Sequence, residues 1–446
     1  MKTFIVTMGC PKNTVDTEAA IGFLRRAGCT MVAAAEEADL LIVNACSFLD
    51  SAWRETVEEV EQLSDLKRTH SGKKIVLMGC LPVHRSEGWR ESLPAVDRFL
   101  PTGAHGLLPS IVDSFRKGGV GFGGTGEIRA DRFAGFENRV RTTPGHLAYV
   151  KIAEGCSRSC SFCAIPAIRG GMVSRPTEAI VREIEALRRE GVKEVSLLAQ
   201  DIASYRDGRS RFPELVDAIA RTGVDWIRVF YVHPASLSVE FARRVFAHPS
   251  VCRYLELPIQ HASDRMLRLM GRGHNRAHLE SVLGRVRQEF PDIVVRSEVI
   301  VGFPGETEED FDDLKRFVES AGFASLGVFV YSREEGTRAA ALGTPVEPAV
   351  AAERSSEITD IQNSVTFGFL SDERGKRHRV LVDRRLERGV RPGFTHAGRY
   401  YGQAYEIDGE VYIRGRGVEP GGFSVVRITD ADAFDLEAEA VDPQSP

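Results

Sequence analysis

The chain has 446 residues, of which 43% are hydrophobic and 27% charged, and its net charge is −5. This length exceeds what one core holds and indicates two or three domains, and no apolar run reaches the length of a membrane span. The acidic balance argues against a protein built as a whole to bind a polyanion. The eight cysteines lack the spacing of a small disulfide framework, and residues 1–6 resemble a first strand, not a signal peptide, so reduced thiols in the cytoplasm are expected.

The first hundred residues alternate short apolar segments with helical patterns, which predicts a doubly wound parallel α/β sheet. We expect strands at residues 3–8, 40–44, 74–78 and 96–100, and helices at residues 14–27, 48–64 and 83–91. A cysteine stands two residues after three of these strands, namely Cys10, Cys46 and Cys80. Because the carboxyl ends of parallel strands share one edge, these thiols are predicted to converge. Three equivalent positions favour a metal cluster; the alternative is three small buried hydrophobes.

Residues 117–143 are rich in glycine and then in charge, with little apolar pattern. A phosphate-binding loop would need a Lys-Ser or Lys-Thr pair after the glycines, and none follows at that spacing. We therefore expect a flexible linker between a first domain, residues 1–116, and a second domain, residues 144–366.

The second domain repeats a strand and a helix about six times, which predicts an incomplete (β/α)6 barrel. Strands are expected at residues 147–152, 194–200, 226–231, 254–258, 293–301 and 325–331, and helices at 177–190, 213–222, 237–247, 264–270, 276–289 and 307–321. Functional groups gather at the carboxyl ends of barrel strands. The candidate ligand contacts there are Gln200, Asp201, Gln260, Ser297, Glu298 and Gly302. Arg169 and Arg175 either contact a ligand as well or pair with surface acids.

A cysteine-rich loop follows the first barrel strand. Cys156, Cys160 and Cys163 lie four and then three positions apart, with Phe162 just before the last. Three thiolates in so tight a loop suit a [4Fe–4S] cluster, and they leave its fourth iron open to a ligand. A zinc site would need a fourth protein ligand, and none lies nearby.

The last part of the chain changes pattern after a helical connector at residues 353–369. Short strands at residues 379–383, 409–413 and 424–428 predict a small antiparallel, OB-like β-barrel over residues 367–436, with an acidic tail from residue 430 to 442. The basic residues 376–379 suit RNA. By contrast, a strand edge with Glu406, Asp408 and Glu410 would attract a basic protein. An ordinary solvated hairpin is the third possibility.

The cysteine loop resembles the Cys-x₃-Cys-x-aromatic-Cys signature of radical S-adenosylmethionine (SAM) enzymes, and residues 164–176 look like the methylthiotransferase branch. The last domain resembles a TRAM domain. The resemblance implies that Cys156, Cys160 and Cys163 hold a [4Fe–4S] cluster whose open iron binds SAM, which is then split to a radical. It also implies a second, auxiliary [4Fe–4S] cluster on Cys10, Cys46 and Cys80, and SAM contacts among the strand-end residues. Since both clusters must reach one substrate carbon, an interface between the sheet edge and the barrel mouth is predicted.

Two branches of this family differ in substrate. RimO-type enzymes methylthiolate the β-carbon of an aspartate in a small-subunit ribosomal protein (the S-twelve protein), and MiaB-type enzymes methylthiolate a tRNA adenosine. Residues 10–13, 165–170, 200–205 and 406–409 look like the RimO type, although Tyr405 departs from its usual pattern. The lack of positive charge also disfavours tRNA.

We therefore expect a cytoplasmic RimO-type transferase without a membrane partner. It would bind the ribosomal protein through the C-terminal domain and take electrons from a reducing donor. One alternative is the MiaB-type reaction. Another, from a different class, is a two-cluster electron-transfer or iron–sulfur carrier protein, which would leave the barrel and its polar strand-end loops without a purpose.

Overall fold

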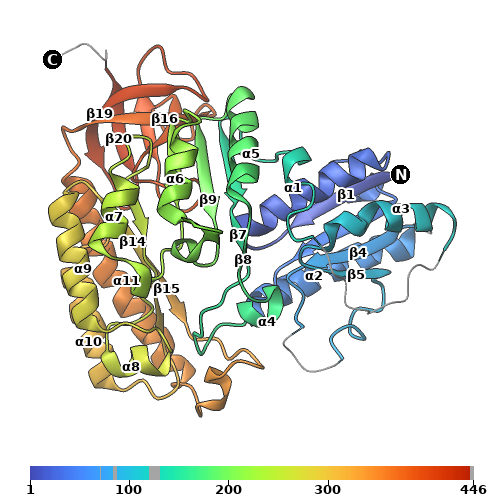
Figure 1. Cartoon of the computed structure of the whole chain (residues 1–446), viewed down its shortest axis with the longest axis horizontal. Coiled ribbons are helices and arrows are strands. Elements are labelled where there is room, and N and C mark those ends of the chain that lie inside the picture. Colours follow the sequence, from blue (N-terminus) through green and yellow to red (C-terminus); the bar gives the residue numbers. More distant parts are fainter. Residues whose placement is uncertain (71, 84–87, 120–130, 442–446) are drawn as a thin grey trace.

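The computed structural model describes residues 1–70, 72–83, 88–119 and 131–441. Three parts follow one another along the chain: an α/β sheet, a half-open central barrel and a closed C-terminal β-barrel (Figure 1). None of the described helices combines the length and the apolarity that crossing a membrane requires.

The N-terminal part is a parallel five-stranded sheet in the order β2-β1-β3-β4-β5. Its strands are β1 (Lys2–Thr7), β2 (Thr30–Met31), β3 (Leu40–Ala45), β4 (Lys74–Gly79) and β5 (Arg98–Pro101). Helices α1 (Pro11–Arg26) and α3 (Leu108–Arg116) pack on one face, and α2 (Asp50–Thr69) packs on the other. Helices on both faces of a parallel sheet confirm the predicted doubly wound arrangement.

The prediction of a helix at residues 83–91 is wrong for the residues of this segment that the structure describes. Residues 84–87 lie outside the described residues, and residues 88–92 form turns. Trp89 contacts Trp53 and Phe99 edge to face, at 5.8 Å and 5.3 Å between ring centroids. These aromatic contacts hold the segment on the sheet without a helix.

The central part contains six parallel strands, in two three-stranded sheets that adjoin where Val232 N donates to Glu256 O (3.0 Å). The strands are β6 (Leu147–Lys151), β9 (Glu194–Leu198), β12 (Trp226–Val229), β13 (Tyr254–Glu256), β14 (Val294–Val301) and β15 (Ser325–Val330). The helices are α4 (Ile165–Arg169), α5 (Thr177–Arg189), α6 (Phe212–Ala220), α7 (Val239–Phe246), α8 (Asp264–Leu269), α9 (Arg276–Glu289) and α10 (Glu308–Ala321). Two short antiparallel pairs complete it: β7 (Ala153–Glu154) with β8 (Val173–Ser174), and β10 (Arg206–Asp207) with β11 (Ser210–Arg211). The predicted six-unit incomplete barrel is confirmed.

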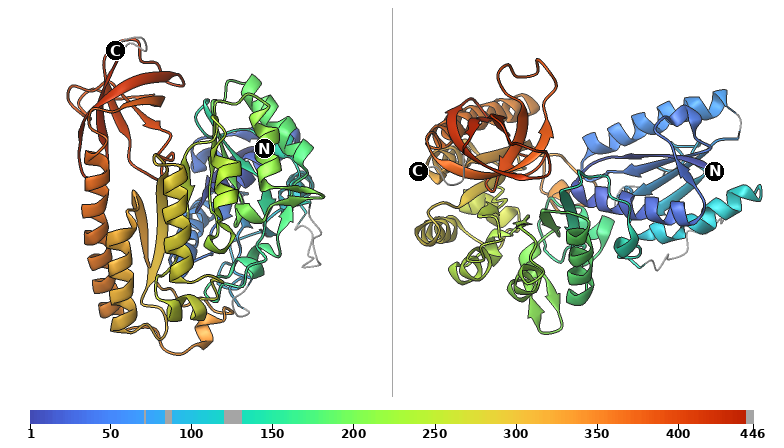
Figure 2. Two further views of the ribbon diagram at one scale, coloured as in Figure 1. Left: turned by 60° about the vertical axis from the view of Figure 1, so that its left-hand side comes forward. Right: turned by 90° about the horizontal axis from the view of Figure 1, so that it is seen from above.

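Residues 131–143 of the segment predicted as a flexible linker are packed against the rest of the chain. Phe136 is buried and stacks on His105 at 5.9 Å. Arg139 pairs with Glu18 of α1 and with Glu183 of α5 (2.9 Å). The glycine-rich residues 120–130 lie outside the described residues. These contacts fasten the N-terminal sheet to the first half of the barrel, where Figure 2 shows the two side by side.

The C-terminal part is a closed five-stranded barrel in the order β16-β17-β18-β20-β19, reached through the long helix α11 (Pro348–Ser371). Its strands are β16 (Arg377–Arg385), β17 (His396–Tyr400), β18 (Val411–Arg414), β19 (Phe423–Ala431) and β20 (Leu436–Ala440). The pairing of β18 with β20 is parallel and the other pairings are antiparallel. Sequence reasoning missed β17 and assigned β20 to an acidic tail. In β20 the side chains of Leu436 and Ala438 are buried in the barrel, so these residues are not a solvated tail.

This barrel covers the amino ends of the central strands. Arg399 bonds Glu194, the first residue of β9, at 2.8 Å, and Phe423 contacts Trp226, the first residue of β12, at 4.9 Å. The hydroxyl of Tyr254, the first residue of β13, donates to Asp408 (2.9 Å). The C-terminal barrel therefore lies at the end opposite the cysteine loop (Figure 1).

The expected acidic strand edge is not present. Residues 401–410 form turns and irregular backbone. Asp408 accepts from Tyr254 and from Ala404 N, and Glu410 pairs with Arg384. Two of the three predicted acids are thus engaged within the chain.

Candidate functional site

The Cys156–Cys163 loop lies at the carboxyl end of the barrel, between β7 and α4. Two backbone bonds fix it, one at its start and one nearer its end: Cys156 N donates to Gly170 O (3.0 Å), and Ser161 N donates to Met270 O (2.9 Å). Phe162 packs with the cluster of apolar side chains around Phe303 and Tyr331. The loop is therefore held by three separate segments of the barrel.

Nitrogen donors surround the loop's sulfur atoms. Arg272 Nη1 donates to Cys160 Sγ (3.2 Å), and Arg158 N donates to Cys156 Sγ (3.4 Å). Burial raises the pKa of Cys156 and raises the pKa of Cys163 to about 12. Binding to iron would favour the thiolate form of these thiols, because a metal ligand must be deprotonated.

The three N-terminal cysteines follow the adjacent strands β1, β3 and β4 at one edge of the sheet, as predicted. Asn13 Nδ2 donates to Met8 O and Ala45 O, and Asn44 Nδ2 donates to Asn13 O (2.8–2.9 Å). These side-chain-to-backbone bonds tie the loop after β1 to the loop after β3.

Two glycines make room for this arrangement. Gly9 and Gly79 have positive φ, at +84° and +99°. A Cβ on Gly9 would lie 2.9 Å from Cys46 Sγ, and one on Gly79 would lie 2.1 Å from Asn44 Oδ1. Any other residue would be strained and would displace a cysteine or its support.

Arg169 joins the two cysteine sets. Its guanidinium, 1% exposed, donates to Cys80 Sγ through Nε (3.2 Å) and Nη2 (2.9 Å), to Asn13 Oδ1 (2.7 Å) and to Glu154 Oε1 (2.6 Å). All of these partners are buried, so the alternative that Arg169 pairs with a surface acid is wrong. Arg175 bonds Lys151 O and Glu183, so it has a structural role as well.

The predicted interface between sheet edge and barrel mouth is present. Cys80 packs against Ala164 and Ile168, which directly follow the cysteine loop. Lys151 of β6 donates to Asp16 of α1 across the same interface, and to Glu154 of the barrel itself, both at 2.6 Å. Burial alone would raise the pKa of Glu154, but Arg169 and Lys151 hold it well below its usual range.

Lys12 adds a further basic side chain to this interface, beside Arg169 and Lys151. Its ammonium lies 3.6 Å from the ring centroid of Tyr231, which has the unusual φ of +61°. Burial raises the pKa of Cys10, but Lys12 and Arg169 outweigh burial and leave that pKa below its usual value. Sequence reasoning noted neither the Lys12–Tyr231 contact nor Arg272; the glycines on both sides of Arg272 were the available signal.

A cavity of about 140 Å³ lies between the two domains beside the loop. Its lining includes Leu49 from the N-terminal part and Phe162, Gln260, Glu298, Phe329 and Tyr331 from the barrel. Gln260 has φ +71°, a strained conformation fixed by backbone bonds to Glu298 O and Ile300 N (both 2.8 Å).

The six predicted ligand contacts divide into two groups. Gln200, Asp201, Gln260 and Glu298 lie near the loop or line this cavity: Gln200 bonds Glu154, and Asp201 accepts from Arg158 (2.7 Å). Ser297 is not brought to the site. Neighbouring strand residues point to opposite faces, and its hydroxyl donates to Leu257 O (2.7 Å) away from Glu298. Gly302 also lies elsewhere, since a Cβ there would lie 2.7 Å from Ala351 of α11.

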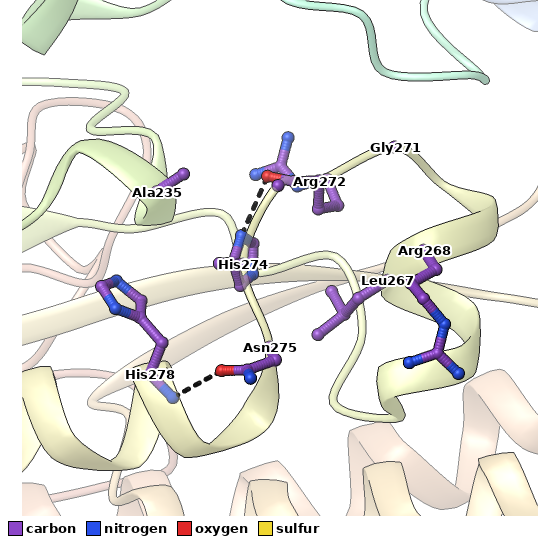
Figure 3. A pocket seen from close by; sticks show the side chains of 9 residues that line it. Ala235, Leu267, Arg268, Gly271, Arg272, His274, Asn275 and His278 are labelled. Atoms are coloured by element: carbon purple, nitrogen blue, oxygen red, sulfur yellow. Dashed lines mark hydrogen bonds between the residues drawn. The ribbon is translucent and has the colours of Figure 1, made fainter.

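A larger pocket of about 610 Å³ opens behind the loop, around residues 267–278 (Figure 3). Its polar side chains include Arg268, Arg272, His274 and His278. His274 Nδ1 bonds Arg272 O (3.1 Å), and Asn275 caps the first turn of α9 by accepting from His278 N (2.9 Å). No residue of the Cys156–Cys163 loop lines this pocket, whereas Phe162 of the loop lines the smaller cavity, so the chemistry points to the smaller cavity.

The residues fit iron–sulfur clusters and SAM better than a single ion. Among the described residues no three His, Cys, Asp or Glu side chains converge on one ion, but a cubane binds each thiolate at a separate iron. The cysteines are free thiols. Gln200 Oε1, Asp201 Oδ1 and the Tyr331 hydroxyl are buried without a hydrogen-bond partner in the described chain. They offer polar contacts to a bound molecule such as SAM.

Three family profiles match successive parts of the chain. They are the uncharacterized protein family UPF0004 at residues 2–101, the radical SAM superfamily at residues 150–318 and the TRAM domain at residues 375–441. Each profile falls on one of the three structural parts.

Curated relatives match almost the whole chain, and those compared here are named ribosomal protein uS12 methylthiotransferase RimO. The protein from Anaeromyxobacter sp. (strain K) is 39% identical over 99% of this chain and 93% of its own length. Those from Geobacter sulfurreducens and Thermotoga maritima are 38% and 36% identical, covering 99% and 98% of this chain and 98% and 99% of their own.

Solved structures support the fold. The radical SAM methyltransferase TsrM from Kitasatospora setae, solved with cobalamin and a [4Fe-4S] cluster bound, superposes with a TM-score of 0.57 at 15% identity, over 78% of this chain and 76% of its own. The radical enzyme OxsB gives 0.51 at 11% identity, over 80% of this chain and 56% of its own.

Proposed function

The chain belongs to the RimO-type radical SAM methylthiotransferases, and we propose that it transfers a methylthio group to the β-carbon of an aspartate in ribosomal protein uS12. The observation that carries this proposal is the identity of 36–39% to proteins of that name over nearly the full chain. The three parts of the fold and both cysteine sets lie within the aligned length.

The cofactors are SAM and two [4Fe–4S] clusters. We assign one cluster to Cys156, Cys160 and Cys163, and the auxiliary cluster to Cys10, Cys46 and Cys80. When bound, they supply the reducing electron that generates a radical from SAM and the sulfur that is methylated and transferred. Gln200, Asp201, Gln260 and Glu298 are proposed to position SAM beside the loop.

The protein's own contribution is placement. Arg169, Asn13 and Lys151 tie the sheet edge to the barrel mouth, so that the loops that carry the two cysteine sets adjoin the same interface. Apolar side chains such as Phe162 and Phe329 restrict water there. Holding reactants in contact geometry accelerates a reaction by several orders of magnitude.

The electron donor and the role of the C-terminal barrel are proposed on chemical grounds. A reducing donor must supply electrons to the clusters. We also propose that the C-terminal barrel helps to bind the ribosomal protein. Its basic side chains Lys376, His378 and Arg379 pair with Glu373 and Asp225, which leaves less charge for RNA phosphates. We place this reaction in the cytoplasm, where ribosomal proteins are made.

Two triple variants test the assignment. Replacing Cys156, Cys160 and Cys163 by alanine is expected to abolish 5′-deoxyadenosine formation from SAM by the reduced, reconstituted protein. Replacing Cys10, Cys46 and Cys80 is expected to keep 5′-deoxyadenosine formation but to stop methylthiolation of uS12. If wild-type protein forms no 5′-deoxyadenosine, the enzyme assignment fails and the electron-carrier alternative gains support.

A further inference from the structure

One strand of the central barrel differs from the rest in exposure. Every residue of β6, β9, β12 and β13 is buried, whereas none of the six residues of β15 is. Phe329 and Val330 are 43% and 46% exposed. Within the described chain β15 pairs only with β14, so its other edge offers free backbone N–H and C=O groups. Such an edge is a template for an added strand.

The two ends of this edge strand each adjoin a cavity. Phe329 and Val330 line the cavity of about 140 Å³ beside the cysteine loop. Ser325, at the other end, lines a cavity of about 400 Å³ together with Phe369 of α11 and with Ile407 and Phe434 of the C-terminal barrel. Phe434 is 57% exposed. β15 therefore leads from the C-terminal barrel to the cysteine loop, a span of roughly 20 Å for six residues.

We propose that β15 is the docking edge for the protein substrate, which adds an extended segment to the sheet with an apolar side chain near Phe434 and the target aspartate in the cavity beside the loop. Main-chain pairing at an exposed edge is a recurrent mode of peptide recognition. A nucleic acid has no backbone amides to pair with a strand, so the exposed edge favours a protein.

The side chains at the end of β15 nearest the cysteine loop are suited to bind an aspartate. The hydroxyl of Tyr331 is buried and has no partner in the described chain, and it is free to donate to the carboxylate. Two glutamates also line this cavity, but both are engaged. Glu298 pairs with Arg296 (3.0 Å), and Glu334 accepts from Asp50 N (2.9 Å).

This inference rests on the proposed function, and hydrogen–deuterium exchange separates the two. With intact uS12 added to the cluster-loaded enzyme and SAM, we expect amide exchange in residues 325–330 to slow by about tenfold or more. The edge strand β5 of the N-terminal sheet, Arg98–Pro101, is the internal control and should keep its rate. Methylthiolation of uS12 without protection of residues 325–330 would overturn the docking edge and leave the function intact. Protection without methylthiolation would support the edge and refute the function, and absence of both would refute both.

Variants give an independent measurement. Phe329→Ala and Phe434→Ala are each expected to raise KM for uS12 about tenfold, since each removes a contact of a large apolar side chain. Phe367→Ala is the matched control, because Phe367 is 50% exposed but lines neither cavity. Unchanged KM in both test variants would contradict the proposal.

Discussion

A single residue, Arg169, links the two domains that carry the cysteine sets. It extends from α4 of the barrel and donates to Cys80 Sγ and Asn13 of the sheet. Hydrogen bonds to cluster sulfurs are among the features that set reduction potentials. Arg169 is thus suited to position the auxiliary site and to tune it.

Arg169→Gln is expected to lower the free energy of unfolding by about 3–5 kcal/mol, because it leaves Glu154 short of a buried partner. In the metal-free protein, alkylation of Cys80 should become about tenfold slower, because Arg169 lowers the pKa of that thiol and its loss leaves less of the reactive thiolate. Arg175→Gln is the matched control: it also breaks a buried ion pair, with Glu183 (2.6 Å), but should leave the alkylation rate of Cys80 unchanged. Equal alkylation rates in the two variants would contradict the role of Arg169.

Glu256 predicts a pH effect on stability. Burial raises its pKa from 4.5 to about 7, against the opposing effect of Arg296. Between these values the folded protein keeps a proton that the unfolded chain releases, so stability falls as pH rises from about 5 to 8. Over that range the wild-type protein should lose on the order of 2 kcal/mol of its free energy of unfolding, and the Glu256→Gln variant should not. Denaturant unfolding at both pH values measures the difference. Glu240→Gln is the control, because Glu240 is exposed. If the free energy of unfolding of Glu256→Gln changes with pH as it does in the wild type, the effect is refuted.

Residue types and spacing were sufficient to predict which cysteines would meet, because parallel strands bring their ends to one edge. They were insufficient for Ser297, whose side chain points away from the cavity that its neighbour Glu298 lines. They were also insufficient for Arg169, since its partner Cys80 is 89 positions away. A single sequence carries no direct record of that contact.

At the scale of elements, the turn after β1 depends on Gly9. Gly9→Ala is expected to displace Cys46 and to reduce bound iron after reconstitution by roughly half, as expected for loss of one of two clusters. Gly28→Ala is the matched control, since Gly28 also has positive φ (+71°) but a Cβ there meets only Arg116 at 3.6 Å. Iron content is measured per chain, and wild-type iron in Gly9→Ala would contradict the account.

Elements with strong apolar periodicity were predicted well, and short ones were not. The expected helix at residues 276–289 coincides with α9 (Arg276–Glu289), whose apolar face packs on the barrel. β20 has the sequence LEAEA. Its alternation of apolar and acidic residues is the signal of a half-buried strand, whereas its acidic residues alone suggest a solvated tail. β17 is short and gave no such signal.

At the scale of the whole molecule, the C-terminal barrel closes the amino end of the central barrel, away from the clusters. The order of elements along the chain does not determine this placement, because it depends on long-range contacts such as Arg399 with Glu194 and Asp383. A substrate that touches both the C-terminal barrel and the clusters must therefore extend along the central barrel, as β15 allows.

Arg399→Ala is expected to loosen this junction, at a cost of about 3–5 kcal/mol for leaving two buried carboxylates short of a partner. Limited proteolysis should then cut faster between α11 and β16. Arg414→Ala serves as the control because its side chain is 52% exposed and its ion pair with Glu439 is long, at 3.9 Å. Wild-type resistance of Arg399→Ala to protease would show that other contacts hold the barrel.

We propose that this chain methylthiolates a ribosomal protein and not a tRNA. The most direct measurement gives the reduced, reconstituted enzyme and SAM two substrates in parallel, uS12 and an isopentenylated tRNA, and follows both by mass spectrometry. We expect a methylthio mass increase on one aspartate of uS12, located by fragmentation, and none on the tRNA. A mass increase on the tRNA alone would contradict the account and assign the chain to the MiaB-type reaction.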